Sequence, residues 1–120
     1  MPVVFVYAMR PPEPERVDVC LSALVHAVSG AIGCPPDTVW VHWIEVAAMH
    51  IGERPQAYEG HGPAIVIRSR PGRSTTAVAA CLQSAAEAAA AALDLPLEDL
   101  WVCWENVAPG AVFTGGTVHL

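Results

Sequence analysis

The chain repeats itself without a gap when its sequence is shifted by 61 residues. Pro2 falls on Pro63, and Cys20 falls on Cys81. The match is densest where residues 40–43, Trp-Val-His-Trp, fall on residues 101–104, Trp-Val-Cys-Trp. A self-match at one fixed offset is typical of two copies of a single supersecondary unit. We therefore predict one domain over residues 1–120, built from repeat 1 (2–47), a connecting loop (48–62), repeat 2 (63–108) and a C-terminal tail (109–120).

Each copy has the pattern of a strand, a helix and a second strand. β-branched runs at 3–8 and 64–69 predict buried strands, and a second strand is expected at 39–46 and at 100–107. Between them, apolar residues recur at helical spacing; Gly33 is expected to end the first helix and Ser74 to cap the second. Two β-α-β units predict an α/β (α+β) fold, a four-stranded mixed sheet with both helices on one face. The uncovered face would then be buried by self-association.

Side-chain alternation along the strands indicates which residues lie on that uncovered face. Val41 and Trp43 in repeat 1, and Val102 and Trp104 in repeat 2, are expected to point toward the helices. The opposite face would carry Trp40, His42, Ile44, Trp101, Cys103 and Glu105. Polar groups there, His42 and Glu105 above all, need partners either in a pocket or in a contact between subunits.

Composition narrows the classes of partner. The chain is 53% hydrophobic and only 15% charged, which favours a homo-oligomer. A net charge of −6 with no lysine argues against nucleic acid. No apolar run approaches the roughly 20 residues of a membrane span, and no signal peptide is evident. We therefore expect a cytoplasmic protein that does not associate with a membrane. The spacing of cysteines and histidines matches no metal site, and no cofactor is predicted.

Two features suggest chemistry. Proline is the residue whose free N-terminus is a secondary amine, so removal of Met1 would turn Pro2 into a general base or acid near neutral pH. Pro63 cannot act in this way, because its nitrogen is an amide. Half of the six positive charges lie within six residues, at Arg68, Arg70 and Arg73. Guanidinium groups bind carboxylates in a bidentate fork, although pairing with acids on the protein surface is the alternative explanation.

Taken together, these residues resemble the tautomerase superfamily, whose short members include 4-oxalocrotonate tautomerase. The resemblance spans essentially the whole chain and rests on the doubled β-α-β unit beginning with Met-Pro. The stretches 35–37 (Pro-Pro-Asp), 72–74 (Gly-Arg-Ser) and 115–116 (Gly-Gly), with Glu45, stand at the family's spacings. The chain is also similar to the long, fused members, which include malonate semialdehyde decarboxylase, cis-3-chloroacrylic acid dehalogenase and macrophage migration inhibitory factor.

The resemblance implies a trimeric enzyme with sites between subunits. Pro2 would move a proton to or from the carbon of a small keto acid or its enol. Arg70 and Arg73 would hold the substrate carboxylate, and Trp101 or Phe113 would form an apolar wall. Asp37, His42, Glu105 and Arg68 are further candidate site residues.

Departures from the family pattern leave alternatives open. Pro12 stands where short members carry the arginine that matches Arg73, while Trp40 and Trp101 replace a second arginine, which favours the fused enzymes. Thr114 stands near the position of the dehalogenase's glutamate, so hydration of a haloacrylate is disfavoured. A β-keto acid (malonate semialdehyde-type) decarboxylase or hydratase is the alternative activity. In a gapless alignment the decarboxylase's aspartate falls one position from Asp37. If Met1 is retained, the expectation is a non-catalytic trimer that is structural or binds a ligand.

Overall fold

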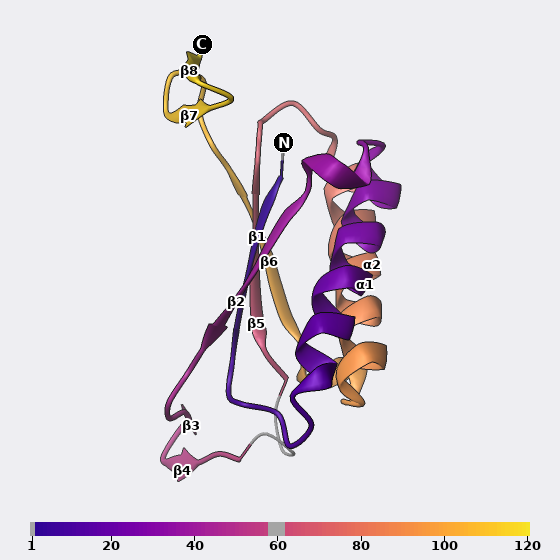
Figure 1. Cartoon of the computed structure of the whole chain (residues 1–120), viewed down its shortest axis with the longest axis vertical. Coiled ribbons are helices and arrows are strands. Elements are labelled where there is room, and N and C mark those ends of the chain that lie inside the picture. The colour runs from indigo at the N-terminus through magenta and orange to yellow at the C-terminus, as the bar shows by residue number, and fades with distance from the viewer. Residues whose placement is uncertain (1, 58–61) are drawn as a thin grey trace.

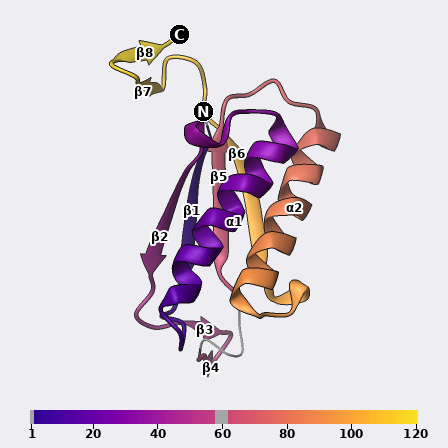
Figure 2. The same ribbon diagram turned by 45° about the vertical axis from the view of Figure 1, so that its right-hand side comes forward.

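The computed structural model describes residues 2–57 and 62–120. Four strands form the main sheet in the order β2-β1-β5-β6. They are β1 (Val3–Ala8), β2 (Trp40–Glu45), β5 (Ala64–Ser69) and β6 (Trp101–Asn106). Strands β1 and β2 run parallel, as do β5 and β6, and the two central strands β1 and β5 are antiparallel. This is the predicted mixed sheet, and the two β-α-β units lie side by side within it (Figure 2).

Helices α1 (Glu15–Ile32) and α2 (Thr75–Leu93) both cover the same face of the sheet, as predicted (Figures 1 and 2). Gly33 ends α1 in the left-handed conformation at φ 72°, and its N–H donates to the Ser29 carbonyl. At the start of α2, the Ser74 hydroxyl accepts a hydrogen bond from the Ala77 N–H at 3.1 Å. Both predicted helix boundaries are therefore confirmed.

The hydrophobic core repeats at the same offset as the sequence. Val4 and Val6 of β1 are fully buried, and so are their counterparts Ile65 and Ile67 of β5. In the helices, equivalent positions are buried even where the side chains differ in size: buried Leu24 of α1 corresponds to buried Ala85 of α2. Small residues on α2 let the two helices approach closely over the centre of the sheet (Figure 2). Cys20 and Cys81, which occupy equivalent positions of the two repeats, are both buried free thiols.

The length of α2 requires one correction to the sequence-based expectations. By length and hydropathy alone this 19-residue helix could cross a membrane, contrary to the expectation that no segment approaches such a span. One side of α2, however, packs on the sheet and on α1, and its buried residues include Cys81, Ala85 and Ala89. The core helix of a globular domain can be equally long and apolar, so length and hydropathy alone do not distinguish such a helix from a membrane span.

Two hairpins lie where a loop and a tail were expected. The segment between the repeats contains β3 (His50–Ile51) and β4 (Arg54–Pro55); residues 58–61 of the predicted loop lie outside the described residues. In the tail, β7 (Val112–Thr114) pairs with β8 (Thr117–His119). Gly115 and Gly116, with φ of 62° and 86°, form the two-residue turn between them. The two hairpins lie at opposite ends of the molecule (Figure 1).

Candidate active site

The antiparallel pairing of the two repeats brings the candidate residues Pro2 and Arg70 to one end of the sheet. Val3 lies opposite Arg68 in the register of β1 and β5, so the start of β1 adjoins the end of β5. Pro2 precedes β1, and Arg70 directly follows β5. Residues 68 positions apart in the sequence therefore lie at the same end of the molecule.

Pro2 is held firmly in this place. Its side chain is fully buried, and its carbonyl accepts the N–H of Trp40 at 3.1 Å. The same bond recurs in the second repeat, where the Pro63 carbonyl accepts the N–H of Trp101 at 3.4 Å. Each proline thus fixes the start of a neighbouring parallel strand. Met1 lies outside the described residues.

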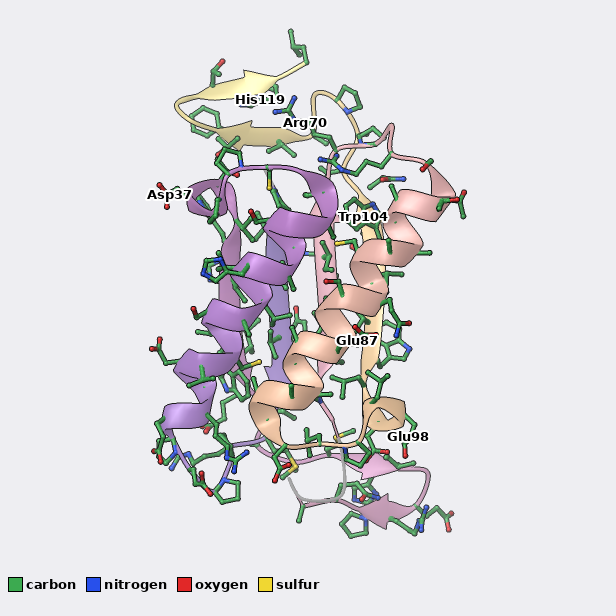
Figure 3. All side chains as sticks on the ribbon, turned by 90° about the vertical axis from the view of Figure 1, so that its right-hand side faces the viewer. Asp37, Arg70, Glu87, Glu98, Trp104 and His119 are labelled. Carbon is green, nitrogen blue, oxygen red and sulfur yellow. The ribbon has the colours of Figure 1, made fainter. Side chains whose placement is uncertain are left out.

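A cavity of about 710 Å³ opens at this end of the sheet, between the strand ends and the C-terminal hairpin. Its walls are mainly apolar and come from five parts of the chain. They are the open face of β1, the turn after α1, the end of β5 with the residues that follow it, the segment after β6, and the hairpin β7–β8. The lining includes Val3, Pro35, Arg68, Arg70, Val107, Val112, His119 and Leu120. Arg70 and His119 lie together at this end in Figure 3. Such a space is large enough for a small organic acid.

The three clustered arginines have different environments. Nε of Arg68 donates to a carboxylate oxygen of Glu105 at 2.9 Å. Arg70 is exposed and lines the cavity, and within the described residues it has neither a hydrogen bond nor an ion pair. Arg73 is half-buried and does not line the cavity. Surface pairing, the alternative weighed from the sequence, therefore describes Arg68 and leaves Arg70 available to an anion.

Arg73 lies on the helix side of the sheet end. Burial raises the pKa of the Cys81 thiol, and the positive charge of Arg73 opposes that effect. The Arg73 guanidinium therefore interacts electrostatically with a buried residue of α2. Arg70 and Arg73, which were predicted to bind one carboxylate together, thus have different surroundings: Arg70 is exposed in the cavity wall, and Arg73 is half-buried.

A row of side chains crosses the open face of the sheet and accounts for two candidate residues. His42 of β2 stacks on Phe5 of β1, with ring centroids 5.2 Å apart and an angle of 21°. The guanidinium of Arg68 lies over the same Phe5 ring at 5.1 Å, which permits a cation–π contact. Glu105 of β6 completes the row through its ion pair, and this hydrogen bond raises the pKa of Arg68. His42 and Glu105 do not line the cavity, and the row ties all four strands together.

The remaining candidates lie farther from Pro2 in their own chain. Trp101 pairs with Ala64 and adjoins Pro63, so it occupies the opposite end of the sheet. Phe113 is 70% exposed, and it points away from the cavity that its neighbours Val112 and Thr114 line. Core packing therefore does not account for Phe113.

Asp37 lies in the short 3-10 helix Pro36–Thr38 at the cavity end, where Figure 3 labels it. Its neighbours Pro35 and Thr38 line the cavity, whereas Asp37 is exposed and does not. Among the described residues, no group of three or more His, Cys, Asp or Glu side chains is placed to bind a metal ion.

The hairpin side of the cavity was missed at the sequence level. Thr114, His119 and Leu120 all line it, yet the segment had been interpreted as a tail. A signal was present, because two short β-prone runs flank Gly115-Gly116, the pattern of a tight hairpin. Cys34 and Thr38 also line the cavity. Their place there depends on how the two repeats pack together, so no local sequence pattern predicts it.

A second, smaller cavity lies at the other end of the sheet. This cavity of about 200 Å³ is lined by Tyr7, Met9, Val46 and Met49, among others, and by no arginine within the described residues. Pro63 is buried nearby, and its nitrogen is an amide. The fold is duplicated, but the cationic lining is not.

Comparison with known proteins supports the fold. No protein-family model matches the chain, and no curated protein matches its sequence. Among solved structures, a native fused 4-OT is 25% identical, with a TM-score of 0.85 over 97% of this chain and 94% of that one. A fused 4-OT described as an asymmetric trimer is 23% identical, with a TM-score of 0.87 over the same shares of both chains. A member of the cis-3-chloroacrylic acid dehalogenase family is 19% identical, with a TM-score of 0.81 over 98% of this chain and 83% of that one.

The macrophage migration inhibitory factor of Toxoplasma gondii also matches, at 20% identity and a TM-score of 0.72, over 98% of this chain and 97% of that one. The resemblance to the tautomerase superfamily drawn from the sequence is thereby confirmed. The chain has the fold of that superfamily, in the long form made of two fused β-α-β units.

Proposed function

We propose that this protein is a tautomerase-superfamily enzyme that interconverts a small keto acid and its enol. After removal of Met1, the secondary amine of Pro2 takes a proton from carbon or returns it. Arg70 binds the substrate carboxylate, with Arg73 adding positive charge from the helix side. The substrate is small and carries a carboxylate, and no cofactor is needed because the amine supplies the base.

One observation carries the proposal. The pairing of β1 with β5 places Pro2 and Arg70 at the same end of the sheet. Arg70 lines the mainly apolar cavity there, and so does Val3, which follows the buried Pro2 in the chain. Within the described residues, Arg70 is a cavity guanidinium without an acidic partner. In apolar surroundings the attraction between a guanidinium and a carboxylate is stronger than in water. An anchored carboxylate would present its neighbouring carbon to the proline amine.

The complete site is proposed to form in a homotrimer. Fused 4-OT structures of this fold are described as trimers. The open face of this sheet exposes Trp40 and Trp101 at 49% and 59%, which favours burial against another copy. Trp101 and Phe113, which lie away from the cavity of their own chain, would then form walls for a neighbour.

Decarboxylation of a β-keto acid remains the second candidate function. The observation that favours it is the predominance of apolar side chains, including Val3, Val107, Val112 and Leu120, in the cavity wall. Poor solvation destabilises a carboxylate relative to the carbon dioxide it becomes. In that reaction a protonated Pro2 would polarise the carbonyl group.

Replacement of Arg70 tests the proposed role of the cavity. Arg70→Ala should lower kcat/KM for enol ketonisation by about 10²-fold, since a charged hydrogen-bonding group contributes roughly 1.5–3 kcal/mol. Steady-state kinetics measures the effect. Arg54→Ala is the matched control, because Arg54 lies in the hairpin β3–β4 at the opposite end of the molecule (Figure 1). Equal kinetics for the two variants would remove Arg70 from the mechanism.

The intact mass must be measured first. Loss of one methionine would expose the Pro2 amine and make the kinetic comparison meaningful. Full retention of Met1 in protein purified at low expression would leave Pro2 as an amide, and the non-catalytic trimer would become the better explanation. Formation of carbon dioxide, assayed on the same sample, separates decarboxylation from tautomerisation.

A further inference from the structure

We propose that His119 is the second proton-transfer group of this cavity, acting on the substrate oxygen while Pro2 acts on carbon. The inference rests on the proposed function, because it supplies the partner that keto–enol interconversion requires. In the enolising direction, the Pro2 amine accepts a proton as the C–H bond breaks and the C=C bond forms. The carbonyl oxygen receives a proton from the His119 imidazolium. One proton leaves the substrate and one arrives, and solvent exchange restores both groups.

The chemistry of the cavity wall singles out this residue. Among the described lining residues, the ionisable side chains are Cys34, Arg68, Arg70 and His119. Arginine keeps its proton throughout the working pH range, and Arg68 is already bound to Glu105. A thiol ordinarily keeps its proton at neutral pH, whereas histidine is the side chain that ordinarily changes charge between about pH 5 and 8. An imidazole is therefore the group in this set best suited to give and take a proton at neutral pH.

The hairpin fixes which ring nitrogen is free. Nε2 of His119 lies 3.1 Å from the Thr114 carbonyl oxygen. A carbonyl oxygen can only accept, so Nε2 must carry the hydrogen, and the neutral ring keeps its lone pair on Nδ1. In the protonated ring, Nε2–H still donates to Thr114 and Nδ1–H is available to a substrate oxygen. The backbone thus holds one nitrogen and leaves the other for chemistry.

His119 is also anchored through its main chain. Its carbonyl accepts the N–H of Gly110 at 2.6 Å, across the base of the hairpin. The Gly115-Gly116 turn brings Thr114 back toward the ring. His119 is therefore held at two points although it is the last residue but one of the sequence, and it is exposed, which permits proton exchange with water.

A purely structural role, in which the ring only clamps the hairpin, makes a different prediction. His119→Gln retains an N–H that can donate to the Thr114 carbonyl, but an amide cannot transfer protons. His119→Ala removes both the clamp and the proton-transfer group. If the ring is only a clamp, the Gln variant should behave as the wild type and the Ala variant should not.

The experiment measures ketonisation of the enol of phenylpyruvate by full-length protein shown by mass to lack Met1. We expect His119→Gln to lower kcat about 10²-fold with KM within twofold, the usual loss on removal of a general acid or base. Free imidazole in the buffer should restore part of the rate of His119→Ala. His26→Gln, on the exposed surface of α1, should leave both constants unchanged.

Wild-type kcat in His119→Gln would overturn the inference and leave the proposed function standing. A wild type that ketonises no enol, despite a free Pro2, would overturn the proposed function and this inference with it. Ring ¹⁵N chemical shifts give a readout that does not depend on activity. They should report hydrogen on Nε2 of neutral His119, and the opposite tautomer would contradict the assignment.

Discussion

At the scale of single residues, equivalent positions of the two repeats have the same structural role, but they do not all have the same chemistry. Val4 and Val6 in one copy and Ile65 and Ile67 in the other are core residues of the same kind. Pro2 and Pro63 both accept a strand N–H, yet only Pro2 can be converted to an amine. The fold thus sets where each proline lies, and the covalent state of its nitrogen decides whether it can do chemistry.

The end of α1 provides a test with an internal control. Gly33 adopts φ 72°, where a β-carbon is strained, whereas Gly30 three residues earlier is helical and a β-carbon there would meet nothing within 4 Å. Gly33→Ala should lower the free energy of unfolding by about 1 kcal/mol. Gly30→Ala should raise it by about 0.5–1 kcal/mol. Urea denaturation measures both, and a shared sign would refute this account of the helix end.

The buried thiol of Cys20 predicts a dependence of stability on pH. Burial raises its pKa from 9.0 to about 12. Between these values the folded state keeps the proton and the unfolded state loses it, so stability falls as pH rises from about 9 toward 12. The full contribution is at most about 4 kcal/mol, at 1.36 kcal/mol per pKa unit. Denaturation of wild type and Cys20→Ala at pH 8 and 10 should show the steeper fall in the wild type; parallel falls would exclude the thiol as the cause.

At the scale of elements, the regular core was predictable, whereas the hairpins had weaker local signals. Strands 3–8 and 64–69 and the helix ends at Gly33 and Ser74 agree with the sequence interpretation because apolar periodicity and caps are local signals. The strands of the hairpin β7–β8 have three residues each, too few to show an alternation of apolar and polar side chains. Its glycine turn is therefore the local sequence feature that indicates it. The cavity was missed for a related reason: its lining joins the hairpin to the ends of β1 and β5, a juxtaposition that spacing along the chain does not encode.

The hairpin β7–β8 should contribute to assembly. It extends beyond the end of the sheet and exposes Phe113, while a small two-stranded hairpin has little stability of its own (Figure 1). Phe113→Ser should weaken the proposed trimer by about tenfold or more, since burial of such a side chain contributes roughly 1.5–3 kcal/mol. Sedimentation over a dilution series measures this. Val19→Ser is the control, an exposed apolar residue of α1, and a similar loss in both variants would argue against a hairpin contact.

At the scale of the whole molecule, the two faces of the sheet differ in kind. The helix-covered face holds the repeated core, whereas the open face combines Trp40, Ile44 and Trp101 with the row formed by His42, Phe5, Arg68 and Glu105. That row has its charges compensated within one chain. Burial of the face against another copy would therefore not leave the Arg68–Glu105 pair without a partner, and such compensation is what makes burial of ion pairs tolerable.

A charge placed on the open face should separate assembly from folding. Trp101→Glu adds an uncompensated carboxylate where the proposed trimer buries an indole, and the cost of several kcal/mol should yield monomers at micromolar concentration. The chain should still fold, because Trp101 lies outside the core and 59% of its surface is exposed. Light scattering with circular dichroism measures both properties, and Val19→Glu on the solvent side of α1 should remain assembled. A trimeric Trp101→Glu would show that subunits meet through another surface. If it is instead a folded monomer that has lost ketonisation while its own Pro2 and Arg70 are intact, the site requires a neighbouring copy.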